Sequence, residues 1–251
     1  MAKVYAFVNQ KGGVGKTTSA INVASFLALD GFRVLLVDSD PQANSTSGIG
    51  IDPRKLEKGV YDVIIGQQAM ADTLFQSPVE RLHIVPATIA LAGASVELVN
   101  VERREYRLQQ AIQTVLPYYD YIIIDCPPSL ELLTVNALVA THEVIIPVQC
   151  EYYALEGLTQ LLNTIKLIQE NLHPKLTVKG VVLTMFDKRN KLSQEIVNEI
   201  KKNLPHKIFN TIIPRNVKLA EAPSYGKPIV FYDSWSKGSR AYRQLTDEIK
   251  Q

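Results

Sequence analysis

The chain has 251 residues, and 46% of them are hydrophobic, which is sufficient for one large core in a single domain spanning residues 1–251. Its longest apolar runs have the length of a strand and its first residues have no signal-peptide pattern, so we exclude a membrane-spanning protein and expect a cytoplasmic one. Residues 1–172 carry 12 Lys or Arg and 18 Asp or Glu, whereas residues 173–251 carry 15 and 7, and such a basic final third indicates a surface that binds a polyanion.

Short apolar runs rich in β-branched residues alternate along the chain with amphipathic segments of helical length. Because the runs lack polar alternation, they predict strands covered on both faces, hence a mostly parallel sheet with helices on each side. The predicted strands are 4–8, 33–37, 82–85, 121–124, 144–148, 178–183 and 207–213, and the predicted helices are 17–29, 106–116, 132–140, 155–172, 193–203 and 239–250, the fifth with Ser193 as its N-cap. Cys126 and Cys150 each follow an apolar strand and are expected to be buried thiols.

The first predicted strand is followed directly by Lys11-Gly-Gly-Val-Gly-Lys-Thr-Thr18, which has the pattern of a phosphate-binding loop. Its glycines let successive N–H groups point at one anion, and the helix that begins near Lys16 adds the positive end of its dipole. We expect Lys16 to reach the β- and γ-phosphates and the Thr17 hydroxyl to bind Mg²⁺. The loop predicts a nucleotide-driven switch on an α/β fold of the P-loop NTPase type, with a twisted sheet of about seven or eight strands. The residues expected to bind the nucleotide are Lys11, Gly12, Gly13, Val14, Gly15, Lys16, Thr17 and Thr18.

Three aspartates follow predicted strands and should meet at the same edge of the sheet. Asp38 and Asp40 come after the second strand, and two carboxylates so close together need a cation. Mg²⁺ bound to ATP supplies it, whereas one of the two carboxylates can instead orient an attacking water. The apolar run 121–124 delivers Asp125 to this edge, as a Walker B strand delivers one carboxylate to the surroundings of Mg²⁺.

Two departures from the usual G-x-x-x-x-G-K-[ST] pattern narrow the interpretation: Gln10 replaces the first glycine, and Lys11 precedes the remaining ones. In this the loop resembles the deviant Walker A motif, K-G-G-x-G-K-[ST], of the ParA/MinD superfamily of ATPases. The resemblance implies that Lys11 reaches across a dimer interface and stabilises transition-state charge on the nucleotide of the partner. It implies catalytic roles for Lys11, Lys16 and Asp40, the last by activating water, and a magnesium site made by Thr17, Asp38 and Asp125.

The resemblance runs almost from end to end and points to the short, chromosomally encoded ParA proteins of bacteria, often called Soj. It rests on segments 9–18, 37–42, 84–87, 125–129, 147–157 and 213–217. Members of that group bind ATP, form a nucleotide sandwich dimer, bind double-stranded DNA without sequence preference, and hydrolyse ATP when a ParB-type centromere-binding protein stimulates them. The implied task is segregation of a chromosome origin or a plasmid, in the cytoplasm and in association with the nucleoid.

Adenine recognition leaves no spacing signature in the sequence. The resemblance places segment 213–216 against the base, with Pro214 packing on it and Asn216 forming a hydrogen bond to its edge. A plain turn at the end of a strand explains the same residues equally well.

The basic residues of the last third support the DNA interpretation directly. Between residues 173 and 218 there are ten Lys or Arg and only three acids. The candidates for phosphate contacts are Lys188, Arg189, Lys201, Lys202 and Lys218, on loops and a helix end. No recognition helix is evident, so binding should ignore sequence. An ordinary solvated surface is the alternative for each residue, and reversing two of these charges should abolish DNA retention while ATP-dependent dimerisation persists.

Three other functions fit parts of the sequence. A MinD-like membrane-associated positioning ATPase needs a terminal amphipathic membrane helix, whereas residues 241–249 carry the short apolar anchors of a packed helix, so we expect no membrane partner. A redox protein resembling the nitrogenase iron protein needs paired cysteines for an Fe–S cluster, which Cys126 and Cys150 do not provide. A metabolic P-loop phosphotransferase or amide-forming ligase needs an acceptor pocket, for which the sequence gives no signal.

Overall fold

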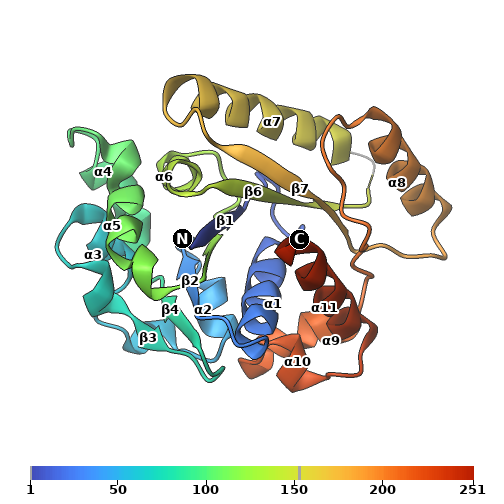
Figure 1. The fold of residues 1–251 in the computed structure, drawn as a ribbon, viewed down its shortest axis with the longest axis horizontal. Helices are drawn as coiled ribbons and strands as arrows, with labels where there is room; N and C mark the ends of the chain where they lie inside the picture. Colours follow the sequence, from blue (N-terminus) through green and yellow to red (C-terminus); the bar gives the residue numbers. More distant parts are fainter. Residues whose placement is uncertain (1, 152–153) are drawn as a thin grey trace.

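The computed structural model describes residues 2–151 and 154–251. A seven-stranded sheet, in the order β3-β4-β2-β5-β1-β6-β7, runs through the middle of the molecule, and its strands are all parallel except β3, which pairs antiparallel with β4 (Figure 1). The strands are β1 (Lys3–Phe7), β2 (Val34–Asp38), β3 (Phe75–Gln76), β4 (Leu82–Val85), β5 (Tyr121–Asp125), β6 (Glu143–Gln149) and β7 (Thr177–Thr184). The predicted α/β architecture is confirmed.

Helices of very different length connect the strands. They are α1 (Lys16–Leu29), α2 (Asn44–Gly48), α3 (Val60–Ile65), α4 (Ala94–Glu97), α5 (Arg107–Val115), α6 (Leu132–Ala140), α7 (Ala154–Asn171), α8 (Lys191–Asn203), α9 (Val217–Glu221), α10 (Ile229–Tyr232) and α11 (Lys237–Lys250). Residues 152–153 of the segment 147–157 lie outside the described residues. Within the described part of the chain, no helix combines the length and apolar character that crossing a membrane requires.

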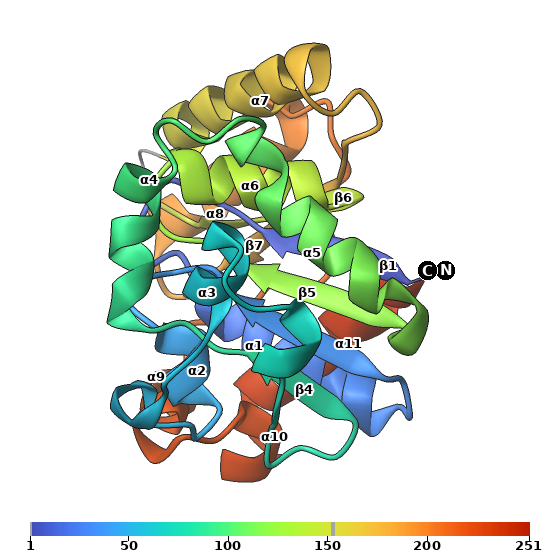
Figure 2. The ribbon, with the colours of Figure 1, turned by 90° about the vertical axis from the view of Figure 1, so that its left-hand side faces the viewer.

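Helices cover both faces of the sheet because each central strand is apolar on both. In β5, Ile122 and Ile124 belong to one core, whereas Tyr121 and Ile123 belong to a second core on the opposite face. Figure 2 shows the consequence, with α5, α6 and α7 on one side of the sheet and α1, α10 and α11 on the other. Apolar runs without polar alternation were therefore a correct sign of strands buried on both faces.

The carboxy-terminal helix closes the second core. Its apolar face, with Tyr242, Leu245 and Ile249 fully buried, packs on α1. At the end of α1, Asp30 accepts hydrogen bonds from Arg243 and Lys250, at 2.6 and 2.7 Å. The prediction of a packed helix is confirmed, and the face that a membrane helix would expose is covered by protein.

The predicted strand 207–213 was wrong. This segment follows the outer edge of β7 with isolated bridges only, because its middle turns to another partner. The backbone amides of Asn210 and Thr211 donate hydrogen bonds to the carboxylate of Glu248 in α11, at 2.8 and 2.7 Å, and so cannot continue a ladder. The unpaired edge of the sheet is thus covered by an irregular segment, which protects it from pairing with other chains.

Three smaller details also differ from the prediction. Helix α8 begins at Lys191 and is capped by Asn190, whose side chain accepts a hydrogen bond from the Leu192 amide, because Ser193 is buried inside the first turn. The helix predicted at 106–116 ends at Val115, and a 3₁₀ turn carries the proline after it. The short antiparallel strand β3 had no signal in the sequence, since two residues are too few to show a pattern.

Candidate functional site

The phosphate loop joins β1 to α1, and two of its positions need glycine. Gly13 and Gly15 have φ angles of +74° and +90°, in the left-handed region that other residues adopt only with strain. Gly15 is the N-cap of α1 and no side chain caps this helix, so the amides of its first turn stay free for an anion. The Thr184 hydroxyl of β7 donates a hydrogen bond to the Val14 carbonyl oxygen at 2.8 Å and holds the loop in place.

The two lysines of the loop have different surroundings. Lys16 is buried, and its Nζ donates a hydrogen bond to the Lys11 carbonyl oxygen at 3.0 Å. Burial lowers the pKa of Lys16, although the nearby charges, that of Asp125 above all, act in the opposite direction. Lys11 is exposed, and its ammonium forms an ion pair with the carboxylate of Glu151 in the same chain. One lysine therefore lies inside the site and the other at its rim.

Asp38 and Asp125 meet at the carboxyl edge of the sheet. Strands β2 and β5 are adjacent and parallel, and Asp38 and Asp125 are partners in their register. On its other side β5 pairs with β1, with Phe7 opposite Asp125, so the phosphate loop begins beside the same carboxylate. Three segments far apart in the sequence thus converge on one point.

Both carboxylates are fully buried, and one of them lacks a partner. Asp38 accepts hydrogen bonds from the amide and the hydroxyl of Thr46, at 2.8 and 2.7 Å, and Asp125 Oδ2 accepts one from Ser45 Oγ at 2.7 Å. Asp125 Oδ1 is buried and has no hydrogen-bond partner among the described residues. Burial, together with the charges of neighbouring aspartates, raises the pKa of both carboxyls. A cation would relieve this buried negative charge.

These residues fit Mg²⁺ held jointly by the protein and a nucleotide. Within residues 2–151 and 154–251, no group of three or more His, Cys, Asp or Glu side chains could hold a metal alone. The free oxygen of Asp125 and the Thr17 hydroxyl, which lies close enough to lower the pKa of Asp125, are oxygen ligands of the kind that Mg²⁺ combines with phosphates and water. Asp40 is buried at the same edge, and its carboxylate accepts a hydrogen bond from the Gln42 amide at 2.9 Å.

A cavity of about 230 Å³ adjoins the phosphate loop. It is lined by Gly15 and Thr18 of the loop and, from far along the chain, by Pro214 and Asn216. The side-chain oxygen of Asn216 caps α9 by accepting a hydrogen bond from the Lys218 amide at 2.8 Å, so its amide nitrogen is the group left for a base. Pro214 and Asn216 thus border on the loop, and their contact with adenine stays a prediction.

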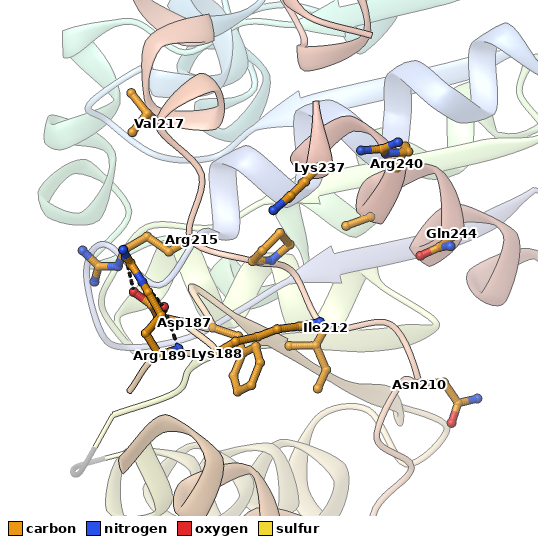
Figure 3. A pocket seen from close by; sticks show the side chains of 13 residues that line it. Asp187, Lys188, Arg189, Asn210, Ile212, Arg215, Val217, Lys237, Arg240 and Gln244 are labelled. Atoms are coloured by element: carbon orange, nitrogen blue, oxygen red, sulfur yellow. Dashed lines mark hydrogen bonds and ion pairs between the residues drawn. The ribbon is translucent and has the colours of Figure 1, made fainter. Parts of the chain in front are cut away.

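A second, larger cavity of about 930 Å³ lies between the loop that precedes α8 and the first half of α11 (Figure 3). Its charged lining residues are Asp187, Lys188, Arg189, Arg215, Lys237 and Arg240, and we call this cavity the basic cleft. Asp187 is the one acid in this lining, and it pairs with Arg189 at 2.8 Å. Hydrogen bonds from Arg189 lower the pKa of Asp187 to about 2, so this carboxyl stays ionised and the cleft keeps a large excess of positive charge.

The residues predicted to contact DNA fall in three places. Lys188 and Arg189 line the basic cleft. Lys218 follows a cleft residue but pairs with Glu221 at 2.9 Å. The pair at 201–202 lies in the last turn of α8, on the order of 15 Å along the helix from the end that adjoins the cleft, and does not line it. Phosphate contacts by these residues stay a prediction.

Three cations of the cleft were not among the predicted DNA contacts: Arg215, Lys237 and Arg240. Lys237 and Arg240 stand three residues apart, which places them on one face of a helix and was a visible signal. What the sequence could not give is the packing of α11 on α1, which brings this face opposite the loop before α8. The ion pair of Lys11 with Glu151 was missed for the same reason.

Both cysteines are free and buried, as predicted. Burial raises the pKa of both thiols, so they remain protonated and take no part in the chemistry of the edge. Cys126 follows Asp125 into the core and Cys150 ends β6. Nothing in this arrangement provides the ligands of an Fe–S cluster.

The order of the strands and the position of the phosphate loop define the class of protein to which the chain belongs. The phosphate loop follows β1, the acidic ends of β2 and β5 flank it, and helix α1 carries the anion-binding amides. This is the geometry of the P-loop nucleotide-binding proteins.

Comparison with known proteins narrows the class to a family. Residues 2–178 match the model of a family described as AAA domain. The sporulation initiation inhibitor protein Soj of Bacillus subtilis (strain 168) is 53% identical over 249 residues, which cover 99% of this chain and 98% of that protein. The chromosome-partitioning ATPase Soj of Treponema pallidum (strain Nichols) is 52% identical, with 99% and 97% covered. The chain belongs to the Soj/ParA family of chromosome-partitioning ATPases.

A solved structure supports the same fold. Cobyrinic acid a,c-diamide synthase from Mycobacterium smegmatis, with bound ADP and magnesium, superposes with a TM-score of 0.87 at 37% identity, covering 98% of this chain and 93% of that one. That protein is a diamide synthase, whereas the two Soj proteins are more similar to this chain in sequence.

Proposed function

We propose that this chain, with ATP and Mg²⁺ as cofactors, forms an ATP-dependent sandwich dimer and binds double-stranded DNA without sequence preference. A ParB-type partner stimulates hydrolysis of the ATP and releases the DNA, and this cycle segregates a chromosome or a plasmid. The protein acts in the cytoplasm on the nucleoid. Membership of a partitioning family and the two sites described above support the proposal.

In the nucleotide site, the loop amides and Lys16 bind the phosphates. Thr17, Asp38 and Asp125 would hold Mg²⁺, which when bound would supply positive charge to the phosphate oxygens. Asp40 orients the attacking water. The unpartnered oxygen of Asp125 supports the assignment, because a buried carboxylate oxygen without a donor is costly unless a cation meets it.

In the proposed dimer, Lys11 contacts the nucleotide that is bound to the second copy. Its ammonium is exposed and pairs with Glu151, so it becomes available to another nucleotide once that pair opens. Gly12 is exposed beside it, and a Cβ atom at Gly12 would have Pro128 as its nearest neighbour, at 3.9 Å. Because Gly12 has no side chain at this exposed position, the backbone of a second copy can approach the loop closely.

One observation carries the link between nucleotide and DNA: Pro214 and Arg215 line both the cavity beside the phosphate loop and the basic cleft. The segment that contains them is bonded to the start of the loop before α8. The Arg215 amide donates to the Phe186 carbonyl oxygen at 3.0 Å, and the Phe186 amide donates to that of Ile213 at 3.1 Å. A nucleotide that shifts this segment shifts the cations of the cleft with it.

The experiment is retention of the full chain on non-specific double-stranded DNA, with ATP, with ADP and without nucleotide, across a salt series. We expect retention only with ATP, a steep loss of affinity as salt rises, and the strongest retention for Asp40→Ala, which holds ATP without hydrolysing it. Asp72→Ala, at an exposed position, is the matched control. Charge reversal at Lys188 and Arg189 should abolish retention and leave ATP-dependent dimerisation unchanged.

Two outcomes would contradict the proposal. If retention on DNA is the same with ATP, with ADP and without nucleotide, DNA binding at the cleft does not depend on the ATP site. No retention in any state, despite normal ATP binding, would remove DNA as the partner, and assays for ATP-dependent binding to lipid vesicles and for amide-forming activity would then separate the MinD-like and the metabolic alternatives.

A further inference from the structure

The one tryptophan of the chain stands out from the described surface. The Trp235 side chain is 85% exposed, in the link between α10 and α11. Water is a poor solvent for most of an indole, and large aromatic side chains left on a surface are enriched where another molecule binds. Neither the nucleotide site nor the packing of the core accounts for this side chain.

The backbone around Trp235 is held rigidly although its ring is free. The Trp235 amide donates a hydrogen bond to the Asp233 carboxylate at 3.2 Å, and the next residue, Ser236, caps α11 by accepting a hydrogen bond from the Ser239 amide at 3.0 Å. Gly238 packs so closely on Leu219 of α9 that a Cβ atom there would lie 2.6 Å from that side chain. The ring is therefore presented in a defined place at the start of α11.

The start of α11 adjoins the basic cleft. Lys237, two residues after Trp235, lines the cleft together with Val217, whose side chain is 70% exposed. In Figure 3, Lys237 projects from the beginning of α11 on the side opposite Lys188 and Arg189. Trp235 thus stands beside a surface that carries five cations and one acid.

The charges around Trp235 favour a polyanion as its partner. Of the nearby acids, Glu221 pairs with Lys218 and Asp187 with Arg189, so Asp233, which accepts a hydrogen bond from the Trp235 amide, is the one set against the cations of the cleft. The cations of the cleft face solvent, and lysine is depleted at the centre of protein interfaces. Aromatic rings beside lysines and arginines are the combination with which proteins stack on bases or wedge into a groove while cations hold the phosphates.

We propose that Trp235 contacts DNA directly, with its indole against the sugars and base edges of a duplex whose phosphates lie in the basic cleft. The inference rests on the DNA binding proposed above, and it adds a contact that does not depend on charge. DNA affinity accordingly has two components. One is set by the cations and falls with salt, and the other is set by Trp235 and does not.

The absence of any other tryptophan makes the first test simple, because selectively excited fluorescence reports on Trp235 alone. The probe is non-specific double-stranded DNA, added to the ATP-bound Asp40→Ala protein. The emission should be quenched along the same curve that retention follows. Adding ATP without DNA should leave it unchanged.

The second test separates the indole from the cations. At constant salt, Trp235→Ala should weaken DNA binding about five- to tenfold, with the slope of log affinity against log salt unchanged. Trp235→Phe should recover most of the affinity. Lys237→Ala should instead lower the slope by about one, since it removes one phosphate contact. ATP binding and dimerisation should be unaffected in all three variants.

The outcomes that overturn the inference differ from those that overturn DNA binding itself. If wild-type protein is retained on DNA while its emission stays constant and Trp235→Ala binds as tightly, Trp235 is not a contact and the proposed function stands. If ATP alone changes the emission, Trp235 lies in an interface between two copies. If wild-type protein binds no DNA in any state, both proposals are wrong.

Discussion

The nucleotide site and the basic cleft share the segment 213–217 but are built in opposite ways. In the nucleotide site, Lys16, Asp38 and Asp125 are buried, and strand register or helix position determines where each lies. In the cleft the cations are exposed, on two loop segments and on one helix face. Chemistry on a phosphate needs atoms held in place, whereas attraction of a polyanion needs only charge of one sign at a suitable distance. Substitutions in the two regions should therefore have different effects.

The largest effect is expected at the rim of the phosphate loop. Gly12→Val should lower ATP-dependent dimerisation by roughly 100-fold, because the side chain would enter the space that a second copy needs, and it should leave ATP binding nearly unchanged. Sedimentation with and without ATP, together with direct nucleotide binding, measures the two effects. Gly13→Val is the matched control: its φ of +74° strains any side chain, so this variant should lose ATP binding itself. Normal dimerisation of Gly12→Val would mean that the two copies do not meet at this face.

A second prediction concerns the buried charge. Asp125→Asn should raise the free energy of unfolding of the nucleotide-free protein by about 1–3 kcal/mol, because it removes one of the buried carboxylates whose negative charges repel each other at this edge. It should also abolish the stabilisation that Mg²⁺ adds to bound ATP. Thermal unfolding with chelator, with ATP and with ATP plus Mg²⁺ measures both. Asp38→Asn is the control, and its gain should be smaller because Thr46 already supplies two hydrogen bonds there. A nucleotide-free Asp125→Asn protein less stable than wild type would show that the carboxylate is already satisfied.

These two substitutions act on residues that the sequence identified. Each of these signals is made by residues that are close together in the sequence, so it can be recognised without the fold. Examples are a glycine-rich loop with Lys16 after a strand and an aspartate after an apolar run. What the sequence could not show is that Asp38 and Asp125 are register partners, since that depends on β2 and β5 becoming neighbours in the sheet while α3, β4, α5 and other elements lie between them in the chain.

The wrong strand and the unpredicted cleft cations also arise from contacts between segments that are far apart in the sequence. Segment 207–213 has the composition of a strand, but Glu248, almost forty residues away, takes two of its amides. Three of the cleft cations come from two segments that only tertiary packing brings to the loop before α8. Local patterns predict local structure, and contacts between distant segments are decided by the fold as a whole.

The cleft itself gives the third prediction. Replacing Lys237 and Arg240 with alanine should weaken DNA binding about tenfold at physiological salt and lower the salt slope by about two, because two phosphate contacts are lost. The matched control is the same change at Lys201 and Lys202, which lie at the far end of α8 and should alter the slope little. Both double variants carry the same change of net charge. If the two double variants lose equal DNA affinity, binding depends on the overall positive charge of this third of the chain and not on the cleft.

The smallest effect is expected at the ion pair between Lys11 and Glu151. The pair is partly exposed, so it contributes at most about 1 kcal/mol, but it holds Lys11 on its own chain. Glu151→Gln should therefore raise ATP-dependent dimerisation about two- to fivefold, and Glu156→Gln, on the exposed surface of α7, should not. Light scattering at a series of ATP concentrations measures this. If Glu151→Gln weakens dimerisation instead, Glu151 is not a restraint on Lys11 but part of the surface that meets the second copy, and the rim of the phosphate loop would then be as preorganised as its interior.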